Sequence, residues 1–207
     1  MSTLAETLEP TDPTPAFSLC VYCGSRPGVE PVYAEIAQFV GTWIGEHKGQ
    51  LVYGGGRNGL MGIVADAALA AGARVIGVIP QALVEKEWAH NGCTELHIVD
   101  NMHERKRIMA EKADAFIALP GGIGTLEEFF EAWTWRQLGY HDKPTGLLNL
   151  GGYYDSLLAF LDTAVKSGFM NDHLMSLIDV GTQPEALLEK LVQAAGTRST
   201  KTRLDQI

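Results

Sequence analysis

The sequence AFIALPGGIGTLEEFFEAW, residues 115–133, joins an apolar segment to a run with helical character. Its first residues are apolar and end at a proline, and glycines then occupy positions 121, 122 and 124. A short apolar run closed by such residues is typical of a buried strand, and the acidic and aromatic residues that follow are typical of a helix. The stretch therefore predicts one strand–turn–helix unit.

The same unit recurs along most of the chain. Apolar, strand-like runs lie at 17–23, 50–55, 74–80, 95–100, 115–120, 145–150 and 177–181. Helix-like runs lie at 32–47, 59–72, 102–113, 153–167 and 184–195, whereas 81–94 reads as irregular. Alternating strands and helices predict a parallel sheet with helices on both faces, in a single-domain, doubly wound, Rossmann-like α/β fold. Seven strands are too few for a (β/α)8 barrel.

Length and composition indicate one packed domain. The chain has 207 residues, 46% of them hydrophobic, and a net charge of −9. We expect a catalytic domain at 16–196 between flexible polar tails at 1–15 and 197–207. The acidic charge disfavours nucleic acid as a partner. Because no apolar run approaches the ~20 residues that span a bilayer and no signal peptide is recognisable, we expect a cytoplasmic protein with no membrane partner.

The three cysteines are expected to be structural thiols. Cys20 and Cys23 form a C-x-x-C pattern, but both lie in the strand-like run at 17–23. Side chains three positions apart on a strand point to opposite faces, so we expect this pair to pack in the core. With Cys93 the number is odd, which favours reduced thiols, and no second pair is present to complete a zinc site.

Three glycine-rich turns come directly after strand-like runs. They are CGSRPG (23–28), YGGGRNGLMG (53–62) and PGGIGTLEE (120–128). The carboxyl ends of parallel strands meet at one edge of a sheet, where open α/β folds bind ligands. Glycine lets the backbone approach a ligand closely, and the start of a helix offers free N–H groups to phosphate. We therefore expect a nucleotide or phosphate site there, with Ser25, Gly54, Gly55, Gly56, Gly122 and Gly124 as candidate contacts.

The second turn does not fit the two commonest nucleotide motifs. GGGRNG, residues 54–59, matches G-x-G-x-x-G, but it follows the second strand, and the next strand carries no acid at its tip to hold an NAD ribose. No Lys-Ser or Lys-Thr follows the glycines, as a P-loop requires. Both a dinucleotide dehydrogenase and a P-loop NTPase are disfavoured.

Charged residues flank the same predicted edge. Arg105 and Lys106 lie near a helix start, where cations oppose the helix dipole; they fit either a phosphate ligand or a solvated helix face. Thr125 and Glu128 match a capping box, although a carboxylate there could also stabilise the positive charge on a ribose as its C1–N bond breaks. His103 suits a polar or capping role. We expect no metal, because no His, Asp, Glu or Cys cluster has ligand spacing.

Taken together, GGGRNGLMG, MHERK and PGGIGTLEE resemble the motifs of the LONELY GUY family. The family signature PGGxGTxxE is matched in full by residues 120–128, and the resemblance covers about 17–195. It implies a phosphoribohydrolase that cleaves AMP or N6-modified AMP to free base and ribose 5-phosphate. It also implies that neither a metal nor a nicotinamide cofactor is needed. Members of this family are often mislabelled lysine decarboxylases.

The resemblance also implies roles for particular residues. Arg105 and Glu128 match the catalytic pair. Glu85 is a rival for the position of Glu87, and Arg57 departs from the small residue of many relatives, so it either contacts phosphate or points to solvent. The implied substrate contacts are Glu87, Arg105, Lys106, Gly122, Ile123, Gly124, Thr125, Leu126, Glu127, Glu128 and Thr134.

The resemblance points to a homodimer, and four aromatic residues on one predicted helix favour the same assembly. These are Phe129, Phe130, Trp133 and Trp135, although they could instead belong to the core of one chain. Two other functions stay open. One is a non-catalytic nucleotide-binding or sensing protein on the same fold. The other is a pyridoxal phosphate enzyme, for which no lysine stands in a recognisable cofactor context.

Overall fold

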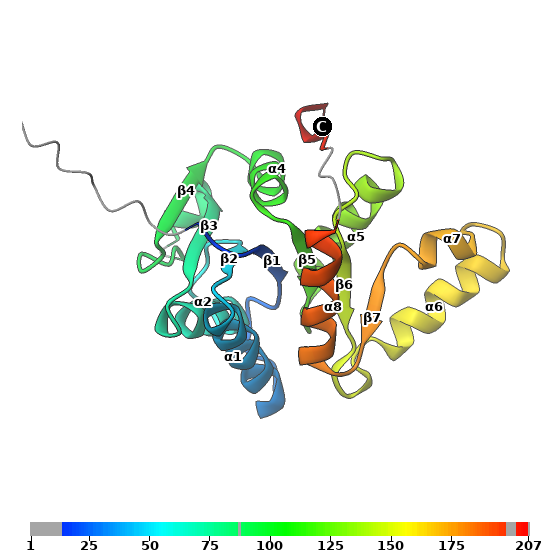
Figure 1. The fold of residues 1–207 in the computed structure, drawn as a ribbon, viewed down its shortest axis with the longest axis horizontal. Coiled ribbons are helices and arrows are strands. Elements are labelled where there is room, and N and C mark those ends of the chain that lie inside the picture. The colour runs from blue at the N-terminus through cyan, green and yellow to red at the C-terminus, as the bar shows by residue number, and fades with distance from the viewer. Residues whose placement is uncertain (1–13, 87, 198–201, 207) are drawn as a thin grey trace, which may run out of the picture.

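Seven parallel strands form one sheet at the centre of the molecule (Figure 1). The computed structural model describes residues 14–86, 88–197 and 202–206. The strand order is β4-β3-β2-β1-β5-β6-β7, so the direction of winding reverses between β1 and β5. The strands are β1 (Ser18–Tyr22), β2 (Gln50–Tyr53), β3 (Arg74–Pro80), β4 (Glu95–Val99), β5 (Ala115–Ala118), β6 (Thr145–Leu148) and β7 (Asp179–Gly181).

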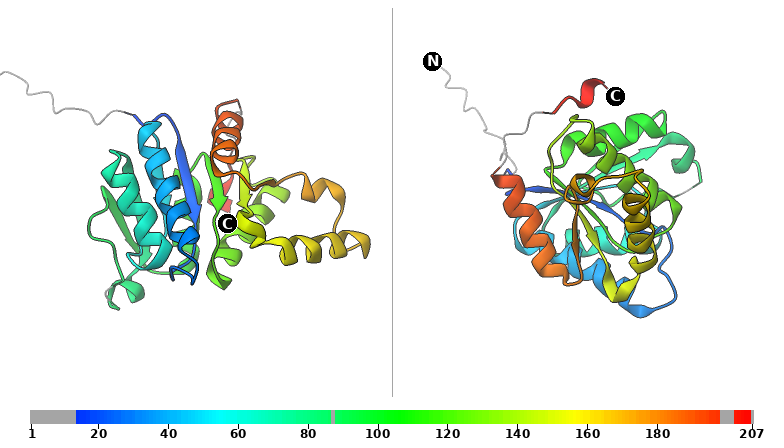
Figure 2. Two further views of the ribbon diagram at one scale, coloured as in Figure 1. Left: turned by 90° about the horizontal axis from the view of Figure 1, so that it is seen from below. Right: turned by 90° about the vertical axis from the view of Figure 1, so that its right-hand side faces the viewer.

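Helices cover both faces of this sheet (Figure 2). One hydrophobic core packs α1, α2 and α8 against the first face, and a second core packs α4, α5 and α6 against the other. The α/β, doubly wound fold predicted from the sequence is therefore confirmed. The helices are α1 (Pro31–Glu46), α2 (Gly59–Ala70), α3 (Gln81–Val84), α4 (Met102–Lys112), α5 (Ile123–Gln137), α6 (Asp155–Lys166), α7 (Asp172–Met175) and α8 (Pro184–Gly196), with short 3-10 turns at η1 (Leu150–Gly152) and η2 (Leu204–Gln206).

Strand β1 shows how the sequence pattern serves two cores. Leu19 packs in the first core and Cys20 in the second, because successive side chains of a strand point to opposite faces. Cys23 lies in the first core, so the C-x-x-C pair is divided between the two faces as the sequence predicted. Burial raises the pKa of both thiols, which keeps them protonated and unreactive.

Helices α1 and α2 pack unusually closely. A Cβ atom placed on Gly41 of α1 would lie 2.3 Å from the carbonyl oxygen of Val64 on α2 and 2.8 Å from the Cβ of Ala67. Real Cβ atoms do not approach other atoms this closely, so the helix pair depends on the missing side chain. Gly41 therefore sets the separation of the two helices that follow β1 and β2.

The structure differs from the sequence prediction in three segments. The region 81–94 begins with the short helix α3, and residue 89 forms an isolated bridge with Gly56. Helix α7 lies within residues 168–176, for which the sequence pattern predicted no helix or strand. Part of the predicted C-terminal tail is packed: Leu204 is buried in the second core, and the Arg203 N–H donates to the Tyr140 carbonyl at 2.7 Å. The tail at 1–15 lies mostly outside the described residues.

The four aromatic residues proposed for a dimer interface serve the fold of one chain. Phe129 and Trp133 are buried in the second core, and Phe130 and Trp135 pack against it. The indole N–H of Trp133 also donates to the carbonyl of Leu174, beside α7. These four residues therefore have a role in the core of one chain, and a homodimer interface on this helix stays a prediction.

Candidate active site

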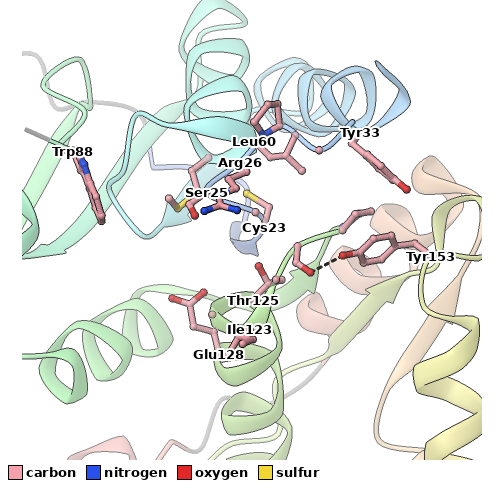
Figure 3. A pocket seen from close by; sticks show the side chains of 18 of the residues that line it. Cys23, Ser25, Arg26, Tyr33, Leu60, Trp88, Ile123, Thr125, Glu128 and Tyr153 are labelled. Carbon is pink, nitrogen blue, oxygen red and sulfur yellow. Dashed lines mark hydrogen bonds between the residues drawn. The ribbon is translucent and has the colours of Figure 1, made fainter. Parts of the chain in front are cut away.

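A pocket of about 550 Å3 lies beyond the carboxyl ends of the central strands (Figure 3). It sits where β1 and β5 run side by side, since Leu19 pairs with Ala115 and the turns that follow the two strands are joined by a bond from the Gly24 N–H to the Pro120 carbonyl. Reversal of the strand order at this place opens a crevice in doubly wound sheets. The lining comes mainly from residues 23–28, 60–61 and 120–125, with single side chains from α1, α3, α4, α5 and the segment after η1.

The N-terminus of α5 forms one wall of the pocket. Gly122 is its N-cap residue and no side chain caps the helix. The first N–H groups of a helix lack partners within the helix, and together with the helix dipole they attract anions. A Cβ atom on Gly122 or Gly124 would meet nothing within 4 Å, so the backbone at these two glycines is open to a ligand. This wall suits a phosphate group.

Gly121 has a different role from the other two glycines of the turn. A Cβ atom there would lie 2.1 Å from the hydroxyl oxygen of Thr125 and 2.8 Å from the backbone nitrogen of Gly24. The position must be glycine for the turns after β1 and β5 to meet. Two tyrosines at the start of α6 hold the same turn: the hydroxyl of Tyr153 donates to the Gly121 carbonyl at 2.8 Å, and that of Tyr154 to the Leu119 carbonyl at 2.7 Å.

The predicted capping box of Thr125 and Glu128 is wrong. Helix α5 begins at Ile123, so Thr125 already lies inside the first turn rather than at the cap, and its side chain is buried. The glycine-rich turn starts the helix earlier than the Thr-x-x-Glu pattern indicated. Glu128 is thereby free of a capping role and points into the pocket.

Glu128 forms an ion pair with Arg105 of α4. The guanidinium Nη1 lies 3.2 Å from Oε1, and only about a tenth of either side chain is exposed. Arg105 is also fixed by two backbone carbonyls: its Nε donates to Val78 at 3.0 Å and its Nη2 to Gly54 at 3.4 Å. Both charged residues line the pocket. The structure thus brings together the two residues that the motifs assigned to catalysis.

Burial raises the pKa of the Glu128 carboxyl above its ordinary value. Arg105 opposes this shift by favouring the carboxylate, while the negative charge of Glu127 adds to it. A carboxyl group whose pKa is raised by desolvation beside a specific charged partner, in a concave site, is typical of catalytic groups. Glu128 can therefore exchange a proton nearer to neutral pH than a surface glutamate can.

Lys106 faces away from the pocket lining. Its buried ammonium group lies 2.5 Å from Glu127 and 2.9 Å from Glu131, both on α5. Burial alone would lower the pKa of Lys106, but the two carboxylates outweigh it and raise the pKa. Lys106 therefore ties α4 to α5, which holds Arg105 and Glu128 at their separation.

The other predicted contacts divide between the pocket and its surroundings. Ser25 and the four residues Gly122–Thr125 line the pocket, whereas Leu126 packs against the second core and Thr134 is exposed further along α5. Gly54, Gly55 and Gly56 lie behind the pocket lining; the Gly54 carbonyl accepts from Arg105, and Gly55 and Gly56 bond to the segment after α3. Glu87 lies outside the described residues. Arg57 is exposed and borders a second, smaller hollow.

Several lining residues carry no motif and were missed by sequence reasoning. Tyr33 of α1, Leu83 of α3, Trp88 and Tyr153 reach the pocket from different segments of the chain. Tyr33 and Tyr153 meet edge to face, with ring centroids 5.6 Å apart, and close one end of the pocket.

Asn101, not His103, caps α4 by accepting from the Glu104 N–H at 2.9 Å. Its Asn-x-x-Glu spacing was the available signal for that cap.

Among the described residues, no group of three or more histidines, cysteines, aspartates or glutamates is placed to hold a metal ion. Across the same part of the chain, no helix is both long and apolar enough to cross a lipid bilayer.

Fold and site together define a doubly wound α/β protein with an uncapped helix start and a buried arginine–glutamate pair at the switch point of its sheet. The sequence model of a family described as "Possible lysine decarboxylase" matches residues 61–191. A "Cytokinin riboside 5'-monophosphate phosphoribohydrolase" of Rhodococcoides fascians is 50% identical over 169 residues, which cover 81% of this chain and 85% of the relative. A protein of the same description from Arabidopsis thaliana is 47% identical over 173 residues, 84% of this chain and 81% of the relative. The chain belongs to this family, the LONELY GUY family.

Solved structures agree on the fold. The molybdenum cofactor binding protein of Rippkaea orientalis superposes with a TM-score of 0.66 at 21% identity, covering 90% of this chain and 100% of that one. The molybdenum cofactor carrier protein of Chlamydomonas reinhardtii gives a TM-score of 0.64 at 20% identity, covering 87% of this chain and 98% of that one. At these identities the likeness concerns the fold alone.

Proposed function

We propose that this protein hydrolyses the N-glycosidic bond of AMP or N6-modified AMP, releasing the free base and ribose 5-phosphate. The observation that carries the proposal is the buried Arg105–Glu128 pair in one pocket with the uncapped start of α5. The names of relatives at 47–50% identity, which describe cytokinin riboside 5′-monophosphate phosphoribohydrolases, support the same activity.

The geometry suggests how the reaction proceeds. The 5′-phosphate binds the N–H groups at the start of α5, and the ribose extends along this helix to Glu128. Breaking the C1′–N9 bond leaves positive charge on the sugar, which the Glu128 carboxylate stabilises. Water adds its oxygen to C1′, the bonding electrons leave with the base, and a proton from the water replaces the lost bond on the base nitrogen. Arg105 holds Glu128 in place and donates to the ribose or the leaving base.

The activity is tested directly with AMP and N6-isopentenyl-AMP. Each nucleotide is incubated with the protein, and free base and ribose 5-phosphate are separated by chromatography. We expect both products in equal amounts from at least one substrate. Nucleotide that binds, measured by calorimetry, but stays intact over hours would support the alternative of a nucleotide-sensing protein. The same comparison identifies the preferred base.

The description as a possible lysine decarboxylase implies a pyridoxal phosphate enzyme, and the site disfavours it. A Schiff base needs a neutral lysine amine. Lys106 is the lysine nearest the catalytic pair in sequence, but it is paired with two carboxylates and its pKa is raised. Absorbance near 400 nm in the purified protein would revive that function.

The remaining parts of the proposal come from the sequence. Glu87 and Thr134 stay predicted substrate contacts. A single catalytic domain at 16–196 and a cytoplasmic location also stay predictions. A homodimer stays a prediction from the family resemblance, and a monomeric mass by light scattering at micromolar concentration would contradict it.

A further inference from the structure

One side of the pocket has no role in the reaction described so far. It is formed by Met61 of α2, Leu83 of α3 and Trp88, which all line the pocket. Trp88 is 45% exposed, an unusual exposure for an indole ring, and Figure 3 shows it on the side of the pocket opposite Tyr33 and Tyr153. Large apolar surface left open inside a pocket favours a flat, apolar ligand group.

The catalytic pair indicates which part of a nucleotide would reach Trp88. Phosphate bound at the start of α5 and ribose at Glu128 are separated by about one helical turn, roughly 5 Å. The base is attached to the sugar carbon at which Glu128 acts, on the far side from the phosphate. Glu128 lies between the Tyr33–Tyr153 end and Trp88 in Figure 3, so the base points toward Trp88.

The glycine triplet holds Trp88 in this position. The N–H of Arg57 donates to the Trp88 carbonyl and the N–H of His90 to the Gly55 carbonyl, both at 2.9 Å, and Gly56 bridges residue 89. The ammonium group of Lys86 lies 5.3 Å from the centroid of the indole ring and favours one orientation of it. The backbone of the glycines at 54–56 thus holds both Arg105 and the Trp88 segment through hydrogen bonds.

We infer that the Trp88 indole is the platform on which the purine base stacks, and that Trp88 sets the preference of this site for a nucleotide over other phosphosugars. The inference rests on the proposed function, because the orientation of the nucleotide follows from it. Stacking on an aromatic side chain is tolerant of the ring substituents of the base, so both AMP and its N6-substituted forms fit the same platform.

The inference is tested with the variants Trp88→Ala and Trp88→Phe. The control is Trp135→Phe, because Trp135 of α5 packs against the second core and does not line the pocket. We expect Trp88→Ala to raise KM for AMP by roughly 5- to 150-fold, the cost of one lost base stack. Trp88→Phe keeps an aromatic face and stays within a few-fold of the wild type. Inhibition by ribose 5-phosphate, which has no base, is unchanged in all three variants.

Tryptophan fluorescence gives a second measurement, which would not respond to AMP if Trp88 had only a structural role. AMP should quench the fluorescence of the wild type and of Trp135→Phe but not that of Trp88→Phe, and ribose 5-phosphate should quench none of them. An unchanged KM for AMP in Trp88→Ala, or an equal loss of affinity for AMP and ribose 5-phosphate, would overturn the inference. Quenching by AMP without hydrolysis in the wild type would support the stacking and sink the proposed reaction instead.

Discussion

Arg105 acts on Glu128 from a fixed position, because two backbone carbonyls and the Glu128 carboxylate leave its guanidinium little freedom. Removing one member of a buried ion pair leaves the other charge uncompensated. The effect of the charge on one member of this pair is therefore best measured with a substitution that removes the charge and keeps the volume of the side chain.

Glu128→Gln is such a substitution. We expect hydrolysis to fall by about 10²–10⁴-fold, the usual contribution of a group that acts on protons or charge in the transition state. Nucleotide binding stays measurable by calorimetry, and circular dichroism verifies the fold. Wild-type turnover in this variant would show that the carboxylate takes no part in the reaction.

The raised pKa of Glu128 predicts a particular pH dependence. The carboxylate form stabilises a positive sugar, and this form is lost as pH falls through the raised pKa. The acid limb of the kcat/KM profile should therefore lie above pH 4.5, the ordinary pKa of glutamate. The limb should be absent from the residual activity of Glu128→Gln. A limb at the same pH in both enzymes would assign the titration to another group.

Gly54 places Arg105, although it does not touch the pocket. A Cβ atom at Gly54 would lie 1.9 Å from Nη2 of Arg105, so Gly54→Ala must push the guanidinium aside. Displacement of a catalytic group by about 1 Å can cost on the order of 10²-fold in rate, and we expect a loss in kcat of that size. Gly196→Ala, where a Cβ atom meets nothing within 4 Å, is the matched control. Equal kcat values for the two variants would contradict this role.

The motifs led from the sequence to the candidate catalytic residues, and pocket residues outside the motifs were missed. Arg105 and Glu128 stand at fixed spacings within MHERK and PGGxGTxxE, whereas Trp88 and Tyr153 arrive in the pocket through tertiary packing that no local pattern encodes. Lys106 differs from its neighbour Arg105 in the same motif, because Arg105 lines the pocket while the ammonium group of Lys106 pairs with Glu127 and Glu131. On a helix, adjacent residues point about 100° apart.

At the scale of elements, the strands were predictable and the short helices were not. Runs such as LCVY and AFIA are buried on both faces, so nearly every residue carries the apolar signal. Helices α3 and α7 span four residues each, too short for a helical period to show. The start of α5 was misplaced because glycine at an N-cap leaves no side-chain signature.

The close packing of α1 on α2 can be tested at Gly41. Alanine normally stabilises a helix interior relative to glycine by about 0.5–1 kcal/mol. At Gly41 the added methyl would strike the Val64 carbonyl, and overpacking of this kind typically costs 1–3 kcal/mol. We expect Gly41→Ala to lower the free energy of unfolding in urea, in contrast to Gly196→Ala. An increase in stability would show that α1 and α2 can separate freely.

At the scale of the whole molecule, the pocket draws its walls from both halves of the sheet. Residues 23–28 and 60–61 precede the switch point and residues 120–125 follow it. A ligand that contacts both halves binds the folded protein and not the unfolded chain. Its binding therefore raises the free energy of unfolding by mass action. We expect the phosphate of the nucleotide to contact both halves, because the turn that leads into α5 is bonded to the turn after β1.

The enzyme should therefore require a 5′-phosphate. The phosphate's binding energy can hold the ribose against Glu128, so its removal should lower turnover as well as affinity. Loss of two charge-assisted contacts, at about 1.5–3 kcal/mol each, implies that adenosine is poorer than AMP by about 10²–10⁴-fold in kcat/KM. Both substrates are compared in one buffer. Values within tenfold of each other would mean that the helix end holds no phosphate.

The position of β1 has a consequence for synthesis on the ribosome. β1 pairs with β2 on one edge and with β5 on the other, and the partner of Leu19 on the second edge is Ala115. At a translation rate of 5–20 residues per second, that edge stays open for roughly 5–20 s after β1 has emerged. The exposed strand is SLCVY, which carries no charge and no proline. An open apolar edge can pair with another nascent chain, so β1 is exposed to such pairing until β5 has been synthesised.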